Sequence, residues 1–175
     1  MTYIETPRLI LRSWRDEDIT PFAELNSNPE VMKYFLKSMS YAESAEFLQK
    51  IRAEFEQFGY GTYALEEKAS GNLIGLTGFH NITFEADFTP GVEIGWRIMP
   101  EYWNKGYVTE AAKACFVYAK EHLPVNHILA FTSMPNKSSQ RVMQKAGMEK
   151  VKNFNHPLVP AGHPLLEHVL YRIHL

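Results

Sequence analysis

A change in hydrophobic period near the middle of the chain predicts a strand that leads directly into a helix. In residues 92–99 apolar side chains alternate with Glu93, Gly95 and Arg97, which is typical of a strand with one buried face. In residues 108–120 the apolar positions recur every three or four residues, as on the buried stripe of an amphipathic helix. We interpret this strand and helix as the unit around which the rest of the chain is organised.

The same periodicities predict the elements on either side of this unit. Capping residues support several of the helix ends, with Asp16 and Asn136 at N-termini and Gly59 and Gly147 at C-termini. The expected strands are residues 8–14, 60–66, 73–80, 92–99, 127–132, 148–154 and 167–174. The expected helices are residues 17–26, 29–34, 41–58, 108–120 and 137–146.

The order of these elements predicts a single α/β (α+β) domain that spans residues 1–175, with a mixed and mostly antiparallel sheet. A turn signal between strands 60–66 and 73–80 favours an antiparallel hairpin. Strands 92–99 and 127–132 flank a helix, so they should be parallel and joined by a right-handed crossover. A chain of this length can bury one substantial core.

Composition and charge exclude several classes of function. The formal net charge of −2 offers no basic surface for nucleic acid, and no apolar run is long enough to cross a membrane. The N-terminus lacks a secretory leader, and the single Cys115 lies on a helical apolar stripe, so we expect a cytoplasmic protein without disulfides. The histidines near the C-terminus fit no compact metal site, and neither a P-loop nor a two-glycine dinucleotide motif occurs.

The joint between the central strand and helix, residues 100–107, is a candidate phosphate-binding turn. It places Asn104, Lys105 and Gly106 just before the helix. The first N–H groups of a helix have no partner within it, and a glycine lets a phosphate approach the backbone closely. A turn with one glycine and one lysine also occurs in plain connections, so the assignment depends on the surrounding motifs.

Four motifs in order resemble the GNAT N-acetyltransferases, in the form of the ribosomal-protein-alanine (RimJ/RimL-like) branch. They are T-P-R-L-I-L-R at 6–12, G-N-L-I-G at 71–75, Y-W-N-K-G-Y-V-T-E-A at 102–111 and N-K-S-S-Q-R-V-M-Q-K-A-G-M at 136–148. The resemblance implies a seven-stranded mixed sheet with helices on both faces. It also implies that strands 92–99 and 127–132 splay apart to receive the pantetheine arm of acetyl-CoA as an added strand.

The resemblance assigns acetyl-CoA as co-substrate to the turn and to the start of the next helix. A backbone N–H near Ile98 or Met99 is the expected oxyanion donor. Trp103 stands where the superfamily usually has another residue, and Val108 is bulkier than the usual small residue beside the pyrophosphate. The expected acetyl-CoA-binding residues are Ile98, Met99, Trp103, Asn104, Lys105, Gly106, Tyr107, Val108, Thr109, Asn136 and Ser139.

Acetyl transfer to an amine requires a base, and Glu93 is the candidate. A carboxylate partly desolvated by the sheet has a raised pKa and can take the amine proton directly or through water. His80 could orient Glu93 or act as the base instead. Many GNAT enzymes place a tyrosine where this chain has Met143, which cannot protonate the leaving thiolate. Ser139, expected to act in catalysis as well as in binding, its neighbour Ser138, or water would supply that proton.

These residues predict an acetyl-CoA-dependent N-acetyltransferase that acts on a primary amine in a ternary complex, as a monomer or homodimer. The branch resemblance favours a protein N-terminal amine, whereas a polyamine, an aminoglycoside or an amino acid would suit the same core. The acceptor groove would be formed by residues 16–60, 81–91 and 155–166. The alternative is a CoA-binding sensor or scaffold without turnover, which Met143 and Val108 keep open.

Overall fold

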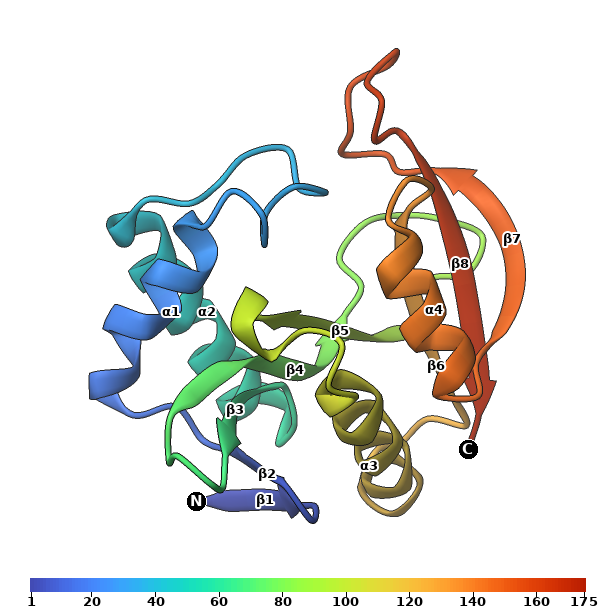
Figure 1. Ribbon diagram of the computed structural model, residues 1–175. Coiled ribbons are helices and arrows are strands. Elements are labelled where there is room, and N and C mark those ends of the chain that lie inside the picture. The colour runs from blue at the N-terminus through green and yellow to red at the C-terminus, as the bar shows by residue number, and fades with distance from the viewer.

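Eight strands form one mixed sheet with helices on both faces (Figure 1). The computed structural model describes residues 1–175, and the strand order across the sheet is β1-β2-β3-β4-β5-β6-β8-β7. All neighbouring strands are antiparallel except β5 and β6. The mixed, mostly antiparallel sheet with a parallel central pair is therefore confirmed. No helix is both long enough and apolar enough to span a membrane.

The elements follow the sequence periodicities to within a few residues. The strands are β1 (Thr2–Glu5), β2 (Leu9–Arg12), β3 (Thr62–Glu67), β4 (Leu73–Asn81), β5 (Val92–Ile98), β6 (His127–Ser133), β7 (Glu149–Asn155) and β8 (Glu167–His174). The helices are α1 (Ile19–Ser27), α2 (Tyr41–Phe58), α3 (Tyr107–His122) and α4 (Lys137–Lys145), with short 3-10 helices η1 (Asp16–Asp18) and η2 (Pro100–Tyr102). Helix α2 has the expected bounds because the Ser40 hydroxyl caps its start and Gly59, at φ 77°, ends it.

The expectation of seven strands was wrong by one. Strand β1 lies at the edge of the sheet and pairs only with β2, with Glu5 opposite Ile10. Its four residues are too few for a period to show in the sequence. The tertiary pairing with β2, rather than local pattern, is what makes this segment a strand.

Two local predictions between β2 and α2 were also wrong. Residues 29–34 form turns instead of a helix, and the Asn28 side chain accepts a hydrogen bond from the amide of Glu30. Asp16 caps no helix, because its carboxylate pairs with Arg52 of α2 at 2.8 Å. The neighbouring Asp18 accepts from the Arg15 amide at 2.7 Å, but its side chain makes no capping hydrogen bond to the first turn of α1.

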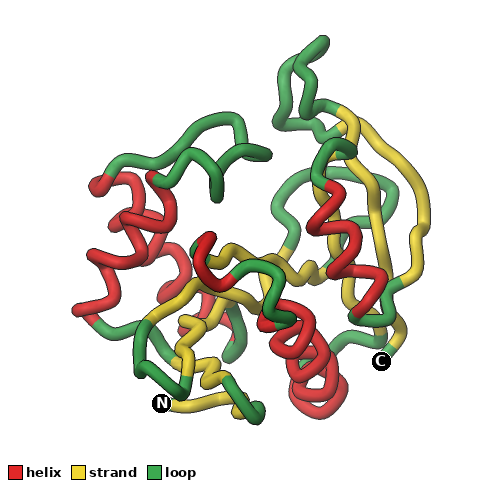
Figure 2. Tube along the Cα trace, viewed as in Figure 1, coloured by secondary structure: helices red, strands yellow, loops and turns green.

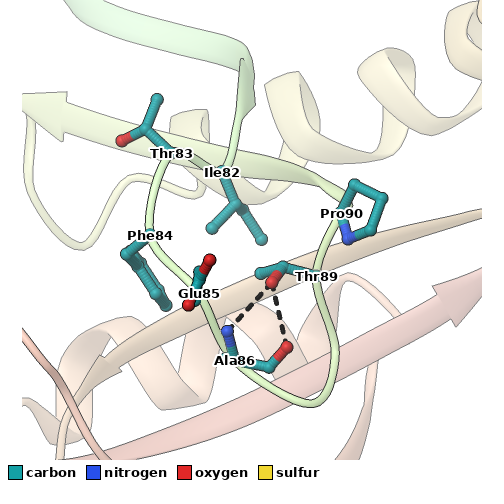
Figure 3. Close-up of a pocket in the computed structure, with 7 residues that line it drawn as sticks. All are labelled: Ile82, Thr83, Phe84, Glu85, Ala86, Thr89 and Pro90. Atoms are coloured by element: carbon teal, nitrogen blue, oxygen red, sulfur yellow. Dashed lines mark hydrogen bonds between the residues drawn. The ribbon is translucent and has the colours of Figure 1, made fainter.

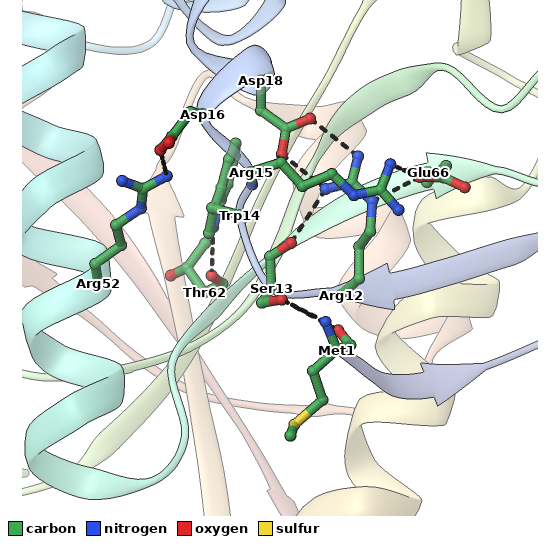
Figure 4. Close-up of polar contacts among 10 residues, drawn as sticks. All are labelled: Met1, Arg12, Ser13, Trp14, Arg15, Asp16, Asp18, Arg52, Thr62 and Glu66. Atoms are coloured by element: carbon green, nitrogen blue, oxygen red, sulfur yellow. Dashed lines mark hydrogen bonds and ion pairs between the residues drawn. The ribbon is translucent and has the colours of Figure 1, made fainter.

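A buried ion-pair network anchors this N-terminal segment to the sheet (Figure 4). Both terminal nitrogens of Arg12 donate to the carboxylate of Asp18, at 2.7 and 2.9 Å, and its Nε donates to Glu66 at 2.5 Å. Arg12 and Asp18 are almost fully buried. The two carboxylates offset the cost of burying the guanidinium charge, and the network fixes η1 against β2 and β3.

The two faces of the sheet carry separate cores. Helices α1 and α2 cover one face, where Phe22, Leu25, Leu48 and Ile51 pack on side chains such as Leu76. Helices α3 and α4 cover the other face over a larger core that includes residues of almost every strand. Because side chains alternate along β5, its even-numbered residues enter the larger core. Its odd-numbered residues, including the polar ones, face the α1 and α2 side.

The parallel pair at the centre of the sheet diverges. Strands β5 and β6 share a single register pair, Glu93 with Leu129, and then separate. The long connections at 28–40 and 156–166 lie at the same end of the molecule, uppermost in Figure 2. The divergence confirms the splayed central strands, and it leaves the β6 side of the second half of β5 without a paired strand.

Candidate functional site

The turn before α3 presents a run of backbone N–H groups that have no acceptor within the protein. None of the amides of residues 104–109 donates to a protein atom, and the first intrahelical bond runs from Glu110 to Gly106 at 3.0 Å. Asn104 and Gly106 have φ angles of 60° and 78°, which is the left-handed conformation found in anion-binding nests. Together with the dipole of α3, these amides suit a phosphate group.

Arg8 of the first motif fastens this turn to the edge of the sheet. Its Nη1 donates to the Lys105 carbonyl at 2.8 Å, and its Nε donates to Glu110 at 2.7 Å. The Thr6 hydroxyl donates to the same carboxylate at 2.6 Å, and the guanidinium lies over the Tyr107 ring at 4.4 Å. Sequence reasoning missed this role, although the T-P-R-L-I-L-R motif contained the signal.

The bulky residues of the turn leave its amides accessible. The Trp103 indole donates to the Ile98 carbonyl at 2.8 Å, which ties the turn to the end of β5. Val108 packs against the larger core, so its side chain does not cover the free N–H groups. Lys105 is near the Tyr102 ring at 5.3 Å. The bulk of Val108 therefore gives no reason to doubt phosphate binding at this turn.

Of the two expected oxyanion donors, only one has a backbone amide that is not hydrogen-bonded to β4. The Met99 amide already donates to the Ile74 carbonyl at 2.9 Å. Amides alternate between the two edges of a strand, so the Ile98 N–H faces β6, from which β5 has diverged. A role for the Met99 amide as oxyanion donor is therefore wrong, and Ile98 remains the candidate.

Glu93 lies partly buried on the α2 side of β5, directly opposite His80 of β4. Burial raises the pKa of its carboxyl to about 7, with a further increase from Glu54 and a decrease from His80. A carboxyl with such a pKa is half deprotonated near neutral pH and can accept a proton from an ammonium group.

His80 is held by the carboxylate of Glu54, a residue of α2. Its Nδ1 lies 2.9 Å from Glu54 of α2, and Glu54 also accepts from the Asn81 amide at 2.8 Å. The hydrogen bond to Glu54 raises the pKa of His80, so the imidazole is more protonated than usual at neutral pH. Glu93 is accordingly the better base, and the His80 imidazole lies beside it on β4.

Of the α4 residues, Asn136 takes its expected place as the N-cap, whereas Met143 lies in the core. Asn136 caps the helix by accepting from the Ser139 amide at 3.3 Å, and its Nδ2 donates to Thr132 at 2.9 Å. The Ser139 hydroxyl makes no hydrogen bond within the protein, whereas that of Ser138 donates to Asn136. Met143 is only 2% exposed and belongs to the larger core. Residue 143 is therefore a packing position in the larger core.

Residues 82–90 form an open hollow between β4 and β5 (Figure 3). Thr89 braces the loop by accepting from the Ala86 amide and donating to the Ala86 carbonyl, both at 2.9 Å. Two aromatic side chains of this loop, Phe84 and Phe88, pack on Phe131 of β6. The loop thus covers β6 on the same face of the sheet as Glu93. Helices α1 and α2 cover the other half of this face and do not reach β6 (Figure 1).

The loop also meets the C-terminal connection that was expected to border the acceptor groove. Phe84 lies 4.6 Å from the ring of His156, and burial lowers the pKa of His156 to about 4. His156 and His168 are 4.9 Å apart, and both are therefore neutral at physiological pH. Glu93 lies between this apolar cover and α2.

The comparisons with known proteins find relatives over most of the chain. Residues 8–149 match the model of the acetyltransferase (GNAT) domain family. The chain is 32% identical to the uncharacterised N-acetyltransferase YoaA of Bacillus subtilis, over 84% of this chain and 82% of that protein. It is 29% identical to the uncharacterised N-acetyltransferase YnaD of the same organism, over 98% and 96%.

A solved structure extends the likeness to the whole fold. An acetyltransferase (GNAT family) from Bacillus anthracis superposes with a TM-score of 0.81 at 28% identity. The match covers 99% of this chain and 98% of that one. The turn before α3 and most of the sheet therefore lie within the matched region.

Proposed function

The chain belongs to the acetyltransferase (GNAT) domain family, and on that premise we propose that it acetylates a primary amine, with a protein N-terminal amine as the first candidate acceptor. It is an acyltransferase, and acetyl-CoA is its co-substrate. The observation that carries the proposal is the position of Glu93. A carboxyl with a pKa near 7 lies on the strand that leads into the turn of free N–H groups.

In this proposal the free amides of residues 104–109 bind the pyrophosphate of acetyl-CoA, and Lys105 adds a positive charge. Bound acetyl-CoA supplies the acetyl group as a thioester. The unpaired edge of β5 beyond Glu93 receives the pantetheine arm, as an added strand would pair there. Asn136 and Ser139, at the start of α4, border the same gap from the β6 side.

Glu93 takes the proton that the acceptor ammonium must lose, directly or through one water molecule. The neutral amine attacks the carbonyl carbon, and the Ile98 N–H donates to the oxygen as it gains negative charge. The carbon–sulfur bond then breaks, the nitrogen loses its second proton to water, and the thiolate takes a proton from water or from the Ser139 hydroxyl, which water reprotonates. A thiol has a pKa of about 8.5, so this last step needs only modest assistance.

The protein N-terminus is the first acceptor because the four sequence motifs resemble the RimJ/RimL-like branch. A small amine is the alternative, since the residues around Glu93 form no motif that selects either class. The two features that favoured a non-catalytic CoA-binding module were Val108 and Met143. Met143 is buried in the larger core and Val108 is partly buried against it, so neither side chain argues against turnover.

The test is thiol release from acetyl-CoA in the presence of a panel of amines and N-terminal peptides, beside calorimetric titration with acetyl-CoA. We expect transfer to at least one peptide N-terminus, with identification of the acetylated nitrogen by mass spectrometry. Transfer to small amines alone would move the acceptor to the second class. Binding of acetyl-CoA without transfer to any amine would contradict the proposal.

A further inference from the structure

Arg97 is a partly buried guanidinium that no carboxylate neutralises. It lies on the α1 and α2 side of β5, and its Nη1 donates to the Asn26 side chain of α1 at 2.6 Å. Its guanidinium lies over the rings of Phe35 and Phe47, at 4.3 and 5.3 Å. No Asp or Glu comes within ion-pair distance of it, whereas the more deeply buried Arg12 pairs with two carboxylates. Burial lowers the pKa of Arg97 to about 10, so the group stays charged at neutral pH.

The position of the Arg97 head group is fixed from several sides. Asn26 is fully buried, and while its oxygen accepts from Arg97, its Nδ2 donates to the hydroxyl of the buried Ser44 at 3.2 Å. Phe35 comes from the connection between α1 and α2, and Phe47 comes from α2 itself. A cation held in place in this way has already lost its rotamer freedom, so a ligand that binds it loses little more.

The backbone between Arg97 and Glu93 is open. Both residues point to the same side of β5, and four residues of strand separate their Cα atoms by about 13 Å. Gly95 lies midway and is exposed, and a Cβ atom there would meet nothing within 4 Å. The strip Glu93–Gly95–Arg97 thus has a base at one end, a cation at the other, and no side chain between them.

We propose that this strip receives an acceptor that carries a carboxylate close to its amine, with the Arg97 guanidinium binding the carboxylate while Glu93 takes the amine proton. The inference rests on the proposed function and specifies its acceptor. The carboxylate can belong to a free amino acid or to an acidic first residue of a peptide. In both cases the chemistry is a bidentate guanidinium–carboxylate pair in a partly desolvated site.

The test compares acceptors that differ by one carboxylate. One pair is a free amino acid and its carboxamide, and the second is a pair of amidated peptides beginning with glutamate or glutamine. We expect the wild-type protein to prefer the carboxylate member of at least one pair by about 10- to 100-fold in kcat/KM, as charged hydrogen bonds imply. The pair that shows the preference identifies the source of the carboxylate.

In Arg97→Gln the preference should disappear, because kcat/KM for the carboxylate member falls to the value for the neutral member, and acetyl-CoA affinity is retained. Arg52→Gln is the matched control, because that arginine pairs with Asp16 at the surface of α2, and the preference should persist in it. Asn26→Asp provides a variant with almost unchanged side-chain shape. The new carboxylate would neutralise Arg97 and should likewise abolish the preference.

Three results would overturn the inference. Equal rates for both members of both pairs in the wild type would show that no carboxylate is recognised. A preference that survives in Arg97→Gln would assign recognition to another residue. Either of these two results would remove only the carboxylate assignment. The third result, no transfer to any acceptor, would remove the proposed function as well.

Discussion

The replacement Glu93→Gln tests the catalytic base through both activity and stability. Glutamine keeps the shape and the hydrogen-bonding capacity of the side chain but cannot accept the amine proton. We expect kcat to fall by about 10²-fold or more near pH 7.5, with acetyl-CoA affinity nearly unchanged. Thiol-release kinetics and calorimetric titration of the same preparations measure the two quantities.

The stability effect follows from the raised pKa of Glu93. Since the folded protein raises that pKa from 4.5 to about 7, the unfolded chain releases the proton first as pH rises. The wild type therefore loses stability between pH 4.5 and 7, and the full penalty applies above pH 7. Discounted for partial solvent exposure, that penalty is on the order of 1–3 kcal/mol. Glu93→Gln should be more stable than the wild type by this amount at pH 8 and equal to it at pH 4.

The pH profile distinguishes Glu93 from His80 as the titrating base. In the wild type, kcat/KM should rise through a midpoint near pH 7. In His80→Asn the midpoint should move to higher pH, because a neighbouring cation that lowers the pKa of Glu93 is lost. In Glu54→Gln it should move to lower pH, because the loss of that negative charge lowers the pKa of Glu93.

Two results would refute the assignment. An unchanged midpoint and a near-normal rate in Glu93→Gln would show that another group takes the proton. Loss of the rate in His80→Asn, with Glu93→Gln active, would assign the base to the histidine and leave Glu54 as the residue that orients it.

The remaining predictions concern the phosphate turn and α4. Gly106→Val should weaken acetyl-CoA binding by about 1–3 kcal/mol in calorimetry, because a β-branched residue is strained at φ 78°; an unchanged dissociation constant would place the phosphate site elsewhere. Arg8→Gln should raise KM for acetyl-CoA more than it lowers kcat, since the carbonyl of Lys105 and the carboxylate of Glu110 lose their shared donor; a fall in kcat alone would argue against a positioning role. Ser139→Ala should slow the chemical step by less than about 10-fold in single-turnover assays, because water can protonate the thiolate; a much larger loss would make the hydroxyl an indispensable acid. Met143→Tyr should lower the free energy of unfolding in urea by about 1–3 kcal/mol, because the core has no room for the ring; unchanged stability with a higher rate would restore the comparison with tyrosine-bearing enzymes.

The parts of the fold that could be predicted are those that a local pattern of hydrophobic period and capping residues indicates. Helix α2 shows its period, its Ser40 cap and its terminal Gly59 within one continuous segment, so its bounds follow from the sequence. Strand β1 has too few residues to show a period, and its pairing partner decides its conformation. The turns at 29–34 follow from Asn28 side-chain bonding, which competes with helix formation in a way that periodicity does not detect.

The candidate site divides in the same way. Glu93 and the turn around Gly106 could be found from alternation and motif, because each lies within a few residues of the feature that identifies it. The contact of Glu54 with His80 and the bond from Arg8 to the turn join segments far apart in the chain, so only the fold brings them together. Arg97 could not be recognised from the sequence as a cation without an acidic partner, because its partner Asn26 lies far away in the chain.

The most direct test of the central claim is the transfer of an isotopically labelled acetyl group from acetyl-CoA to an amine, measured at saturating acetyl-CoA for the wild type and Glu93→Gln. The account predicts label on the amine nitrogen with the wild type, and a transfer rate lower by about 10²-fold in the variant at equal cofactor occupancy. Equal transfer rates for the two proteins, or label found only as free acetate, would contradict it.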